Sequence, residues 1–164
     1  MLIRASAFAV GKDFDQPLGA LIQSGGTWFV RAQIKDRGES IDVAIAISGD
    51  NLGDVIYFGN PSSCVHLAQG LGVEYRIAGA IEGPGTPPAG ALVWSVDGKE
   101  QAFAVNGTYV TQAGTESKSC SKDRAFYARN WGAWLVGEDG KDVGDEALFF
   151  NKIAGAQGVT TAAK

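Results

Sequence analysis

Two tight-turn dipeptides, Asp97-Gly98 and Asn106-Gly107, constrain the fold of this chain more than any other feature of its sequence. Both central residues of a two-residue hairpin loop need a positive φ, which Asn, Asp and Gly adopt most readily. Such short loops set the register of the flanking strands, and the expected cross-strand partners are Trp94 with Gln101, Leu92 with Phe103, and Phe103 with Val110. Residues 92–112 are therefore predicted to form a three-stranded antiparallel meander with a single buried side.

Alternation of apolar and polar residues predicts a second hairpin nearer the N-terminus. The alternation runs through 27–35 and returns in 41–47, and the segment 36–39 between them supplies the turn. A period of two is typical of a strand with one buried face. A short third strand is expected at 55–58, and the segment 74–81 should return the chain to the sheet.

Local capping signals predict short helices. Asn60 can cap a helix, Pro61 suits the first helical position because its missing N–H has no partner there, and Gly72 is typical of a helix end. Residues 61–71 are therefore predicted to be an amphipathic helix packed on the preceding strands. We also expect a helix from 121 to about 130 and a strand at 133–136, and 146–153 is a candidate for a further helix.

The predicted fold class is α+β, with antiparallel hairpins, the meander and one or two short helices packed on the sheet. Glycine supports this class, because 23 of the 164 residues are glycine, about twice the usual share, and glycine favours turns over long helices. The chain is expected to be a single domain, 1–164, with sub-regions 1–82 and 91–153. A Gly/Pro loop at 83–90 should join the sub-regions, and 154–164 is predicted to be a polar tail with little to bury.

Charge and cysteine usage indicate a soluble cytoplasmic protein. Fourteen Lys and Arg against eighteen Asp and Glu give a net charge of −4, which repels nucleic acid and acidic membrane surfaces. Cys64 and Cys120 lie far apart in no metal or redox motif, so free thiols in a reducing compartment are expected. The apolar N-terminus is interpreted as a first strand instead of a secretion signal, and no apolar run approaches the about 20 residues of a membrane span.

The sequence predicts no catalytic residue, metal or cofactor. His66 is the single histidine, and on the predicted helix it would point about 200° away from Cys64, so the two would form no dyad. Motifs for a serine nucleophile, a P-loop or a dinucleotide are absent. The acidic segments 50–54 and 138–146 are interpreted as solvated turns instead of calcium loops. An enzyme using His66 or a pair of carboxylates stays an alternative.

Basic and aromatic residues gather in the last third of the chain. The candidate partner-binding residues are Lys122, Arg124, Phe126, Tyr127, Arg129, Trp131 and Trp134. Aromatic rings interleaved with cations suit the bases and phosphates of single-stranded nucleic acid, and the same residue types dominate protein–protein hot spots. Because tryptophan more often fills a core, the burial of these rings decides whether they form a site.

We therefore expect a non-enzymatic binding, accessory or inhibitory protein of the kind found in phages and plasmids. Its partner is expected to be another protein or a second copy of itself, with single-stranded nucleic acid as the alternative. The glycine-rich β character also suits a structural subunit of a virion or another assembly.

Overall fold

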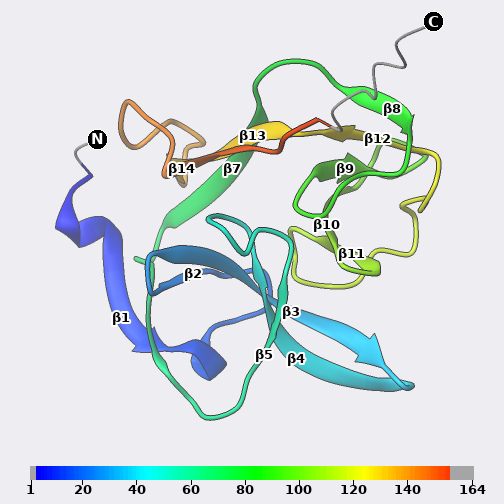
Figure 1. Ribbon diagram of the computed structural model, residues 1–164. Helices are drawn as coiled ribbons and strands as arrows, with labels where there is room; N and C mark the ends of the chain where they lie inside the picture. The colour runs from blue at the N-terminus through cyan, green and yellow to red at the C-terminus, as the bar shows by residue number, and fades with distance from the viewer. Residues whose placement is uncertain (1–2, 156–164) are drawn as a thin grey trace, which may run out of the picture.

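The computed structural model describes residues 3–155, and their regular secondary structure is almost entirely antiparallel β-sheet (Figure 1). Fourteen strands make three sheets, and the helical segments of this range are two 3-10 turns, η1 (Ala5–Ala7) and η2 (Asp13–Asp15). The predicted α+β class, with helices packed on a sheet, is therefore wrong. No helix between residues 3 and 155 is long and apolar enough to cross a membrane.

The largest sheet has six strands in the order β1-β6-β2-β3-β4-β5. The bounds are β1 Phe8–Lys12, β2 Leu21–Ser24, β3 Thr27–Asp36, β4 Glu39–Ala46, β5 Val55–Tyr57 and β6 Ser63–Leu67. The predicted N-terminal hairpin is confirmed by the pairing of β3 with β4. Arg37 and Gly38 make its turn with φ values of 49° and 89°, as a two-residue hairpin loop requires.

The second sheet has five strands in the order β11-β10-β9-β12-β8. The bounds are β8 Glu82–Gly85, β9 Leu92–Trp94, β10 Gln101–Val105, β11 Thr108–Thr111 and β12 Ala125–Ala128. The predicted register of the meander is confirmed for all three cross-strand pairs. Its single buried side is wrong, because Val93, Ala102 and Tyr109 are buried on the opposite face, where Cys120 and Ile153 pack against them.

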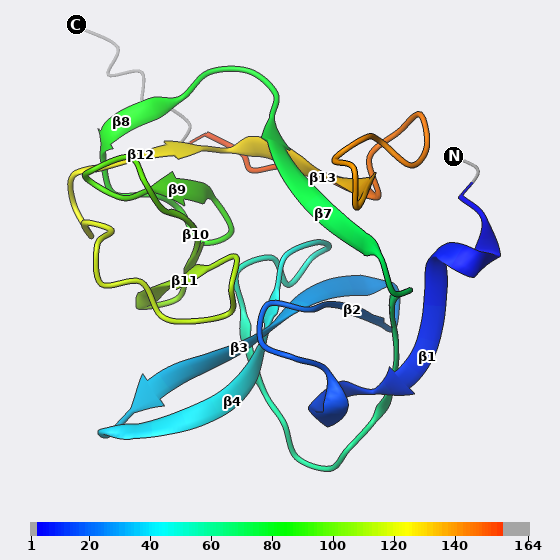
Figure 2. The ribbon, with the colours of Figure 1, turned by 180° about the vertical axis from the view of Figure 1, so that it is seen from behind.

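The third sheet has three strands, β7 (Leu71–Ile77), β13 (Asn130–Gly137) and β14 (Phe149–Lys152), in the order β14-β13-β7. Only Arg129 separates β12 from β13, so the second and third sheets are continuous along the chain. Figure 2 shows β12 and β13 as one nearly straight ribbon above the six-stranded sheet. One hydrophobic cluster fills the space between the layers, with Val30 and Ile45 from the large sheet meeting Leu92, Phe103 and Trp131.

The predicted helix at 61–71 is wrong. Residues 63–67 form β6, which lies between β1 and β2, and the next strand, β7, begins at Leu71. An isolated helix of this length is marginal in water, whereas a strand with neighbours on both sides satisfies its backbone groups. In the turn between β6 and β7 the glycine with a positive φ is Gly70, at 82°, and not Gly72, which was expected to end the helix.

The other two predicted helices are also wrong. Within 121–130 the chain forms β12, and within 146–153 it forms β14; the expected strand at 133–136 lies inside β13. In β13 the alternate residues Trp131, Ala133 and Leu135 are all buried, which is the spacing of one face of a strand. The predicted loop at 83–90 begins with most of β8, and beyond Gly155 the predicted tail lies outside the described residues.

Candidate functional site

The seven predicted partner-binding residues do not form one surface. Trp131 is fully buried, and its Nε1 donates a hydrogen bond of 2.9 Å to the carbonyl oxygen of Gly90. Tyr127 is 8% exposed and packs in the cluster on the second face of the five-stranded sheet. These two rings therefore stabilise the fold and are not available to a partner.

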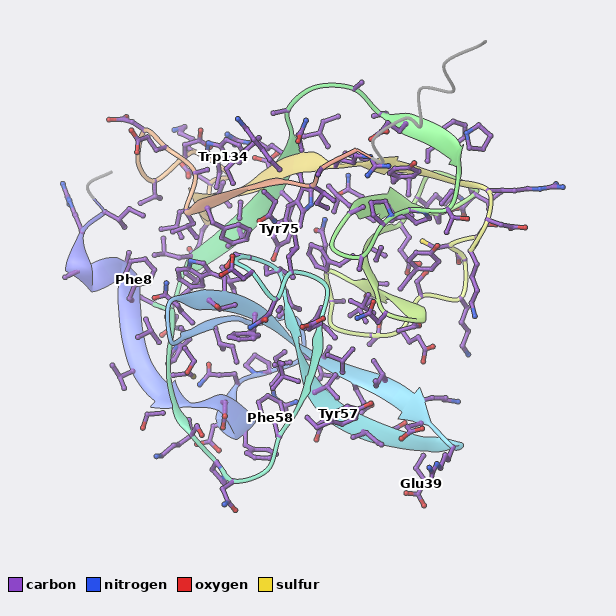
Figure 3. All side chains as sticks on the ribbon, in the orientation of Figure 1. Phe8, Glu39, Tyr57, Phe58, Tyr75 and Trp134 are labelled. Carbon is purple, nitrogen blue, oxygen red and sulfur yellow. The ribbon has the colours of Figure 1, made fainter. Side chains whose placement is uncertain are left out.

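Trp134 lies on the outer face of the three-stranded sheet, whereas Tyr75 lies on the inner face (Figure 3). The guanidinium of Arg76 covers the Trp134 ring at 5.2 Å and pairs with the carboxylates of Glu74 and Asp142. These carboxylates raise the pKa of Arg76 above its usual value, chiefly through the hydrogen bonds to Asp142. The indole and the cation are thus already engaged within the chain.

Arg129 is engaged in a similar way. Its Nε lies 2.8 Å from a carboxylate oxygen of Glu82, and its guanidinium lies 5.6 Å from the centre of the Tyr127 ring. Nη1 of Arg129 also donates to the carbonyl oxygen of Ala154. Arg129, which directly follows β12, is therefore bonded to β8 and to the segment after β14. Its guanidinium is already paired with the Glu82 carboxylate.

Phe126 is the one predicted aromatic residue that is open to solvent. It is 51% exposed, although its neighbours along β12, Ala125 and Tyr127, are buried. Its cross-strand partner on β9 is Trp94, which is partly buried at the edge of the main core. Beyond Trp94 the chain leaves β9, and Val96 in the following loop is 80% exposed.

Four exposed cations lie on the segments that flank this apolar surface, Lys99 in the loop after β9 and the other three in the segment before β12. The loop after β9 is joined to the segment before β12 by a hydrogen bond of 3.3 Å from Val96 N to Ser119 O. None of the cations forms an ion pair with any residue between 3 and 155. We define the Phe126 patch as Trp94, Val96, Lys99, Lys118, Lys122, Arg124 and Phe126.

The acidic side chains near the Phe126 patch are turned to internal donors. Asp97 accepts hydrogen bonds from the Ser95 hydroxyl and the Lys99 amide, which lower the pKa of its carboxyl group. Glu100 accepts a hydrogen bond of 2.5 Å from the Ser117 hydroxyl. Asp123, between Lys122 and Arg124, likewise accepts a hydrogen bond from the Ser121 hydroxyl. Within residues 3–155 these carboxylates therefore bond to hydroxyl and amide donors and form no ion pair with the cations of the patch.

Comparison with known family models, curated proteins and solved structures finds no match to this chain. The candidate site therefore rests on geometry and chemistry alone.

Sequence reasoning found three members of the patch, Lys122, Arg124 and Phe126, and missed its other half. Val96 was expected on the buried side of the meander, because its alternation continues that of Leu92 and Trp94. The strand ends at Trp94, however, so Val96 lies in a loop that turns outward. Periodicity contains no signal for that early end, and the exposure of Val96 could not have been predicted from it.

Cys64 and His66 are two residues apart on β6, so their side chains lie on the same face of the strand. The expectation that they point apart assumed a helix here and is therefore wrong. His66 lies beside a hydrogen-bonded carbonyl, with its Nδ1 2.9 Å from Leu67 O. Burial, and secondarily the charge of Asp13, raise the pKa of the Cys64 thiol. Cys64 is therefore protonated near neutral pH and is a poor nucleophile.

In the described part of the chain, the acidic turns at 50–54 and 138–146 do not form a cation-binding site. Within residues 3–155 no group of three or more His, Cys, Asp or Glu side chains is placed to hold a metal ion. In the turn at 138–146, Asp139 pairs with Lys141 at 3.2 Å and Asp142 pairs with Arg76.

Replacing Asp142 with Asn is expected to reduce the acid sensitivity of the fold. Arg76 lowers the pKa of Asp142 in the folded protein, chiefly through a side-chain hydrogen bond. A depressed carboxyl pKa stabilises the fold above the unfolded value of about 4, and this stabilisation is lost as the pH falls through the folded value. Urea unfolding at a series of pH values around 4 should show a shallower loss of stability in Asp142→Asn than in the wild type.

The matched control for this experiment is Asp145→Asn, which removes a neighbouring carboxylate without an ion pair in the described part of the chain. Identical pH profiles for the two variants would contradict the assignment of acid sensitivity to the contact between Asp142 and Arg76.

Proposed function

We propose that this chain is a non-enzymatic binding protein that docks another protein on the Phe126 patch. The observation that carries the proposal is the exposure of Phe126 between two buried neighbours, on a segment whose exposed cations form no ion pair within residues 3–155. An exposed apolar ring close in sequence to long cationic side chains has the residue types of the anchor and rim of a protein interface. The partner surface should carry carboxylates and a shallow apolar pocket for the phenyl ring.

A protein partner is favoured over single-stranded nucleic acid by the burial of the other rings. Successive bases need several exposed rings to stack on, and Tyr127 and Trp131 are both buried. The net charge of −4 also opposes a polyanion as a whole. A protein interface needs only one or two anchors, which Phe126 and Trp94 can supply.

The proposal predicts that Phe126→Asp weakens partner binding at least about 10-fold, because it places a charge in the centre of an apolar contact. Val10→Asp is the matched control, since Val10 is 77% exposed on β1, at the opposite side of the molecule from β12 in both views (Figures 1 and 2). The measurement has two parts. Sedimentation equilibrium of the purified protein tests a second copy as partner, and quantitative capture from cells that encode the protein compares the three forms.

The expected result is a complex that Phe126→Asp removes and Val10→Asp preserves, with affinity decreasing as salt rises. Equal complex formation by Phe126→Asp and the wild type would overturn the proposal. Tryptophan quenching by an oligothymidylate at low salt tests the alternative partner. Quenching that Phe126→Asp abolishes would assign the patch to nucleic acid and would contradict a protein partner.

A further inference from the structure

A cavity of about 640 Å³ lies where the chain passes from β6 in the six-stranded sheet to β7 in the three-stranded sheet. Its walls come from the segment around β2, from the turn between β6 and β7, and from the end of β11. Figure 2 shows β7 rising over β2 at this corner of the molecule. The volume lies within the range of small-molecule binding sites.

The lining of this cavity exposes more apolar than polar surface, and its polar groups come from a few side chains. It contains no Asp, Glu, Lys or Arg, and its polar side chains are those of Gln16, His66, Gln69, Tyr75 and Gln112. A charged ligand would lose its hydration here without gaining an opposite charge. The cavity is therefore suited to a neutral ligand that forms several hydrogen bonds.

Three of the polar side chains already use a donor atom within the protein. Gln16 Nε2 donates to Lys12 O at 3.1 Å, and Gln112 Nε2 donates to Gln101 Oε1 at 2.6 Å. His66 Nδ1 lies 2.9 Å from Leu67 O and donates to it. Each amide nitrogen keeps a second N–H donor, and the two amide oxygens, together with Nε2 of the neutral His66 ring, are acceptors that a ligand hydroxyl can satisfy.

Gly11 gives the side chains of Gln16 and His66 room to approach each other. A Cβ atom at Gly11 would lie 2.9 Å from Gln16 Nε2 and 3.0 Å from His66 Nε2. Glycine inside a strand is unfavourable unless something must come close, and Gly11 lies inside β1. The close approach of the Gln16 and His66 side chains therefore requires glycine at position 11, although glycine is unfavourable within a strand.

Tyr75 supplies a donor to the same cavity. Its ring packs edge-on against Phe103, with 5.0 Å between centroids, and against Trp131, with 5.8 Å. Burial raises the pKa of the Tyr75 hydroxyl, so it stays protonated. In the part of the chain that the structure describes, this hydroxyl is not among the polar atoms that are sealed from solvent without a partner, so it can bond to solvent or to a ligand.

From these observations we infer that the cavity is a binding site for a neutral saccharide. Each sugar hydroxyl both donates and accepts, so a saccharide can satisfy the acceptors of Gln16, His66 and Gln112 together with the Tyr75 donor. A phosphate or a carboxylate has no donor for those acceptors, and an ammonium group would find no carboxylate. This site is separate from the Phe126 patch and does not depend on it.

The test is isothermal titration of the purified protein with maltose, cellobiose, lactose and N,N′-diacetylchitobiose. Glucose 6-phosphate and glucosamine serve as the charged comparisons. At least one neutral disaccharide is expected to bind with a micromolar to millimolar dissociation constant, and the charged sugars at least about 10-fold more weakly. Failure of all four neutral disaccharides to bind at millimolar concentration would overturn the inference.

Variants then locate the binding. Tyr75→Phe keeps the ring packing, Gln69→Ala changes an exposed side chain, and each is expected to weaken saccharide binding by about 3- to 10-fold. Gly11→Ala should weaken it by displacing Gln16 and His66. Gln23→Ala, outside the cavity, and Phe126→Asp should bind like the wild type. Unchanged affinity in both Tyr75→Phe and Gln69→Ala would place the ligand elsewhere and contradict the site.

Discussion

Trp131→Ala is expected to lower the free energy of unfolding by about 3–5 kcal/mol, the range found when a large buried aromatic side chain is truncated. Trp131 is fully buried, and its ring lies 5.4 to 5.9 Å from those of Phe103, Tyr75 and Phe149. The substitution would leave a cavity between the sheets and also remove the donor to Gly90 O. The loss reflects a structural role for a residue whose type alone suggested a binding surface.

Urea unfolding followed by circular dichroism measures this change. Phe126→Ala is the control, because it truncates an exposed aromatic ring of the same sheet system and should cost less than about 1 kcal/mol. Trp131→Phe keeps most of the packing and isolates the hydrogen bond, so it should fall between the two. A cost for Trp131→Ala as small as that of Phe126→Ala would show that Trp131 is not a core residue.

Gly114→Ala is expected to destabilise the fold by about 3–5 kcal/mol, the sum of a steric and a conformational cost. Gly114 has a φ of 78°, and a Cβ atom there would lie closer than 3.0 Å to Arg31 O and to Gly19 N. Both are backbone atoms, and Gly19 N is itself hydrogen-bonded to Arg31 O at 2.7 Å. The loop after β11 therefore cannot move away without breaking its contact with β3.

Gly107→Ala separates the two costs. Gly107 has a similar φ of 86°, but nothing lies within 4 Å of the position that a Cβ atom would take there, so only the left-handed conformation is penalised, at about 1–2 kcal/mol. The difference between the two variants in urea unfolding is the steric cost at Gly114. Equal destabilisation by the two substitutions would show that the loop after β11 yields freely and would contradict the tight packing.

The hairpins were predictable because their information is local. Each of the loops Arg37-Gly38 and Asn106-Gly107 has a glycine with a positive φ at its second position, and a two-residue loop leaves one register for the strands beside it. The expected positive φ at Asn106 is not found, whereas Arg37 has one. The helix at 61–71 was predicted from equally local signals around Asn60 and Pro61. It failed because β6 bonds to β1, which lies about 50 residues earlier in the chain, and capping signals carry no information about such partners.

The candidate site also has a part that residue types indicate and a part that depends on contacts between distant segments. Residue types pointed to the segment that contains Lys122, Arg124 and Phe126, since cations and aromatic rings are concentrated there. They could not separate exposed Phe126 from buried Tyr127 and Trp131, because exposure depends on what packs over each face of a strand. The cavity with Tyr75 was not predicted at all, since Gln16, His66 and Gln112 meet only when three distant segments come together.

By itself, the sequence determined the turns, the registers of two hairpins and the segment that carries the exposed patch, because each depends on residues close together along the chain. The tertiary structure decided that the chain is all β, which aromatic rings are buried and where a neutral cavity opens. These outcomes depend on pairing and covering between segments far apart in sequence, and no local pattern encodes which segment will be the neighbour.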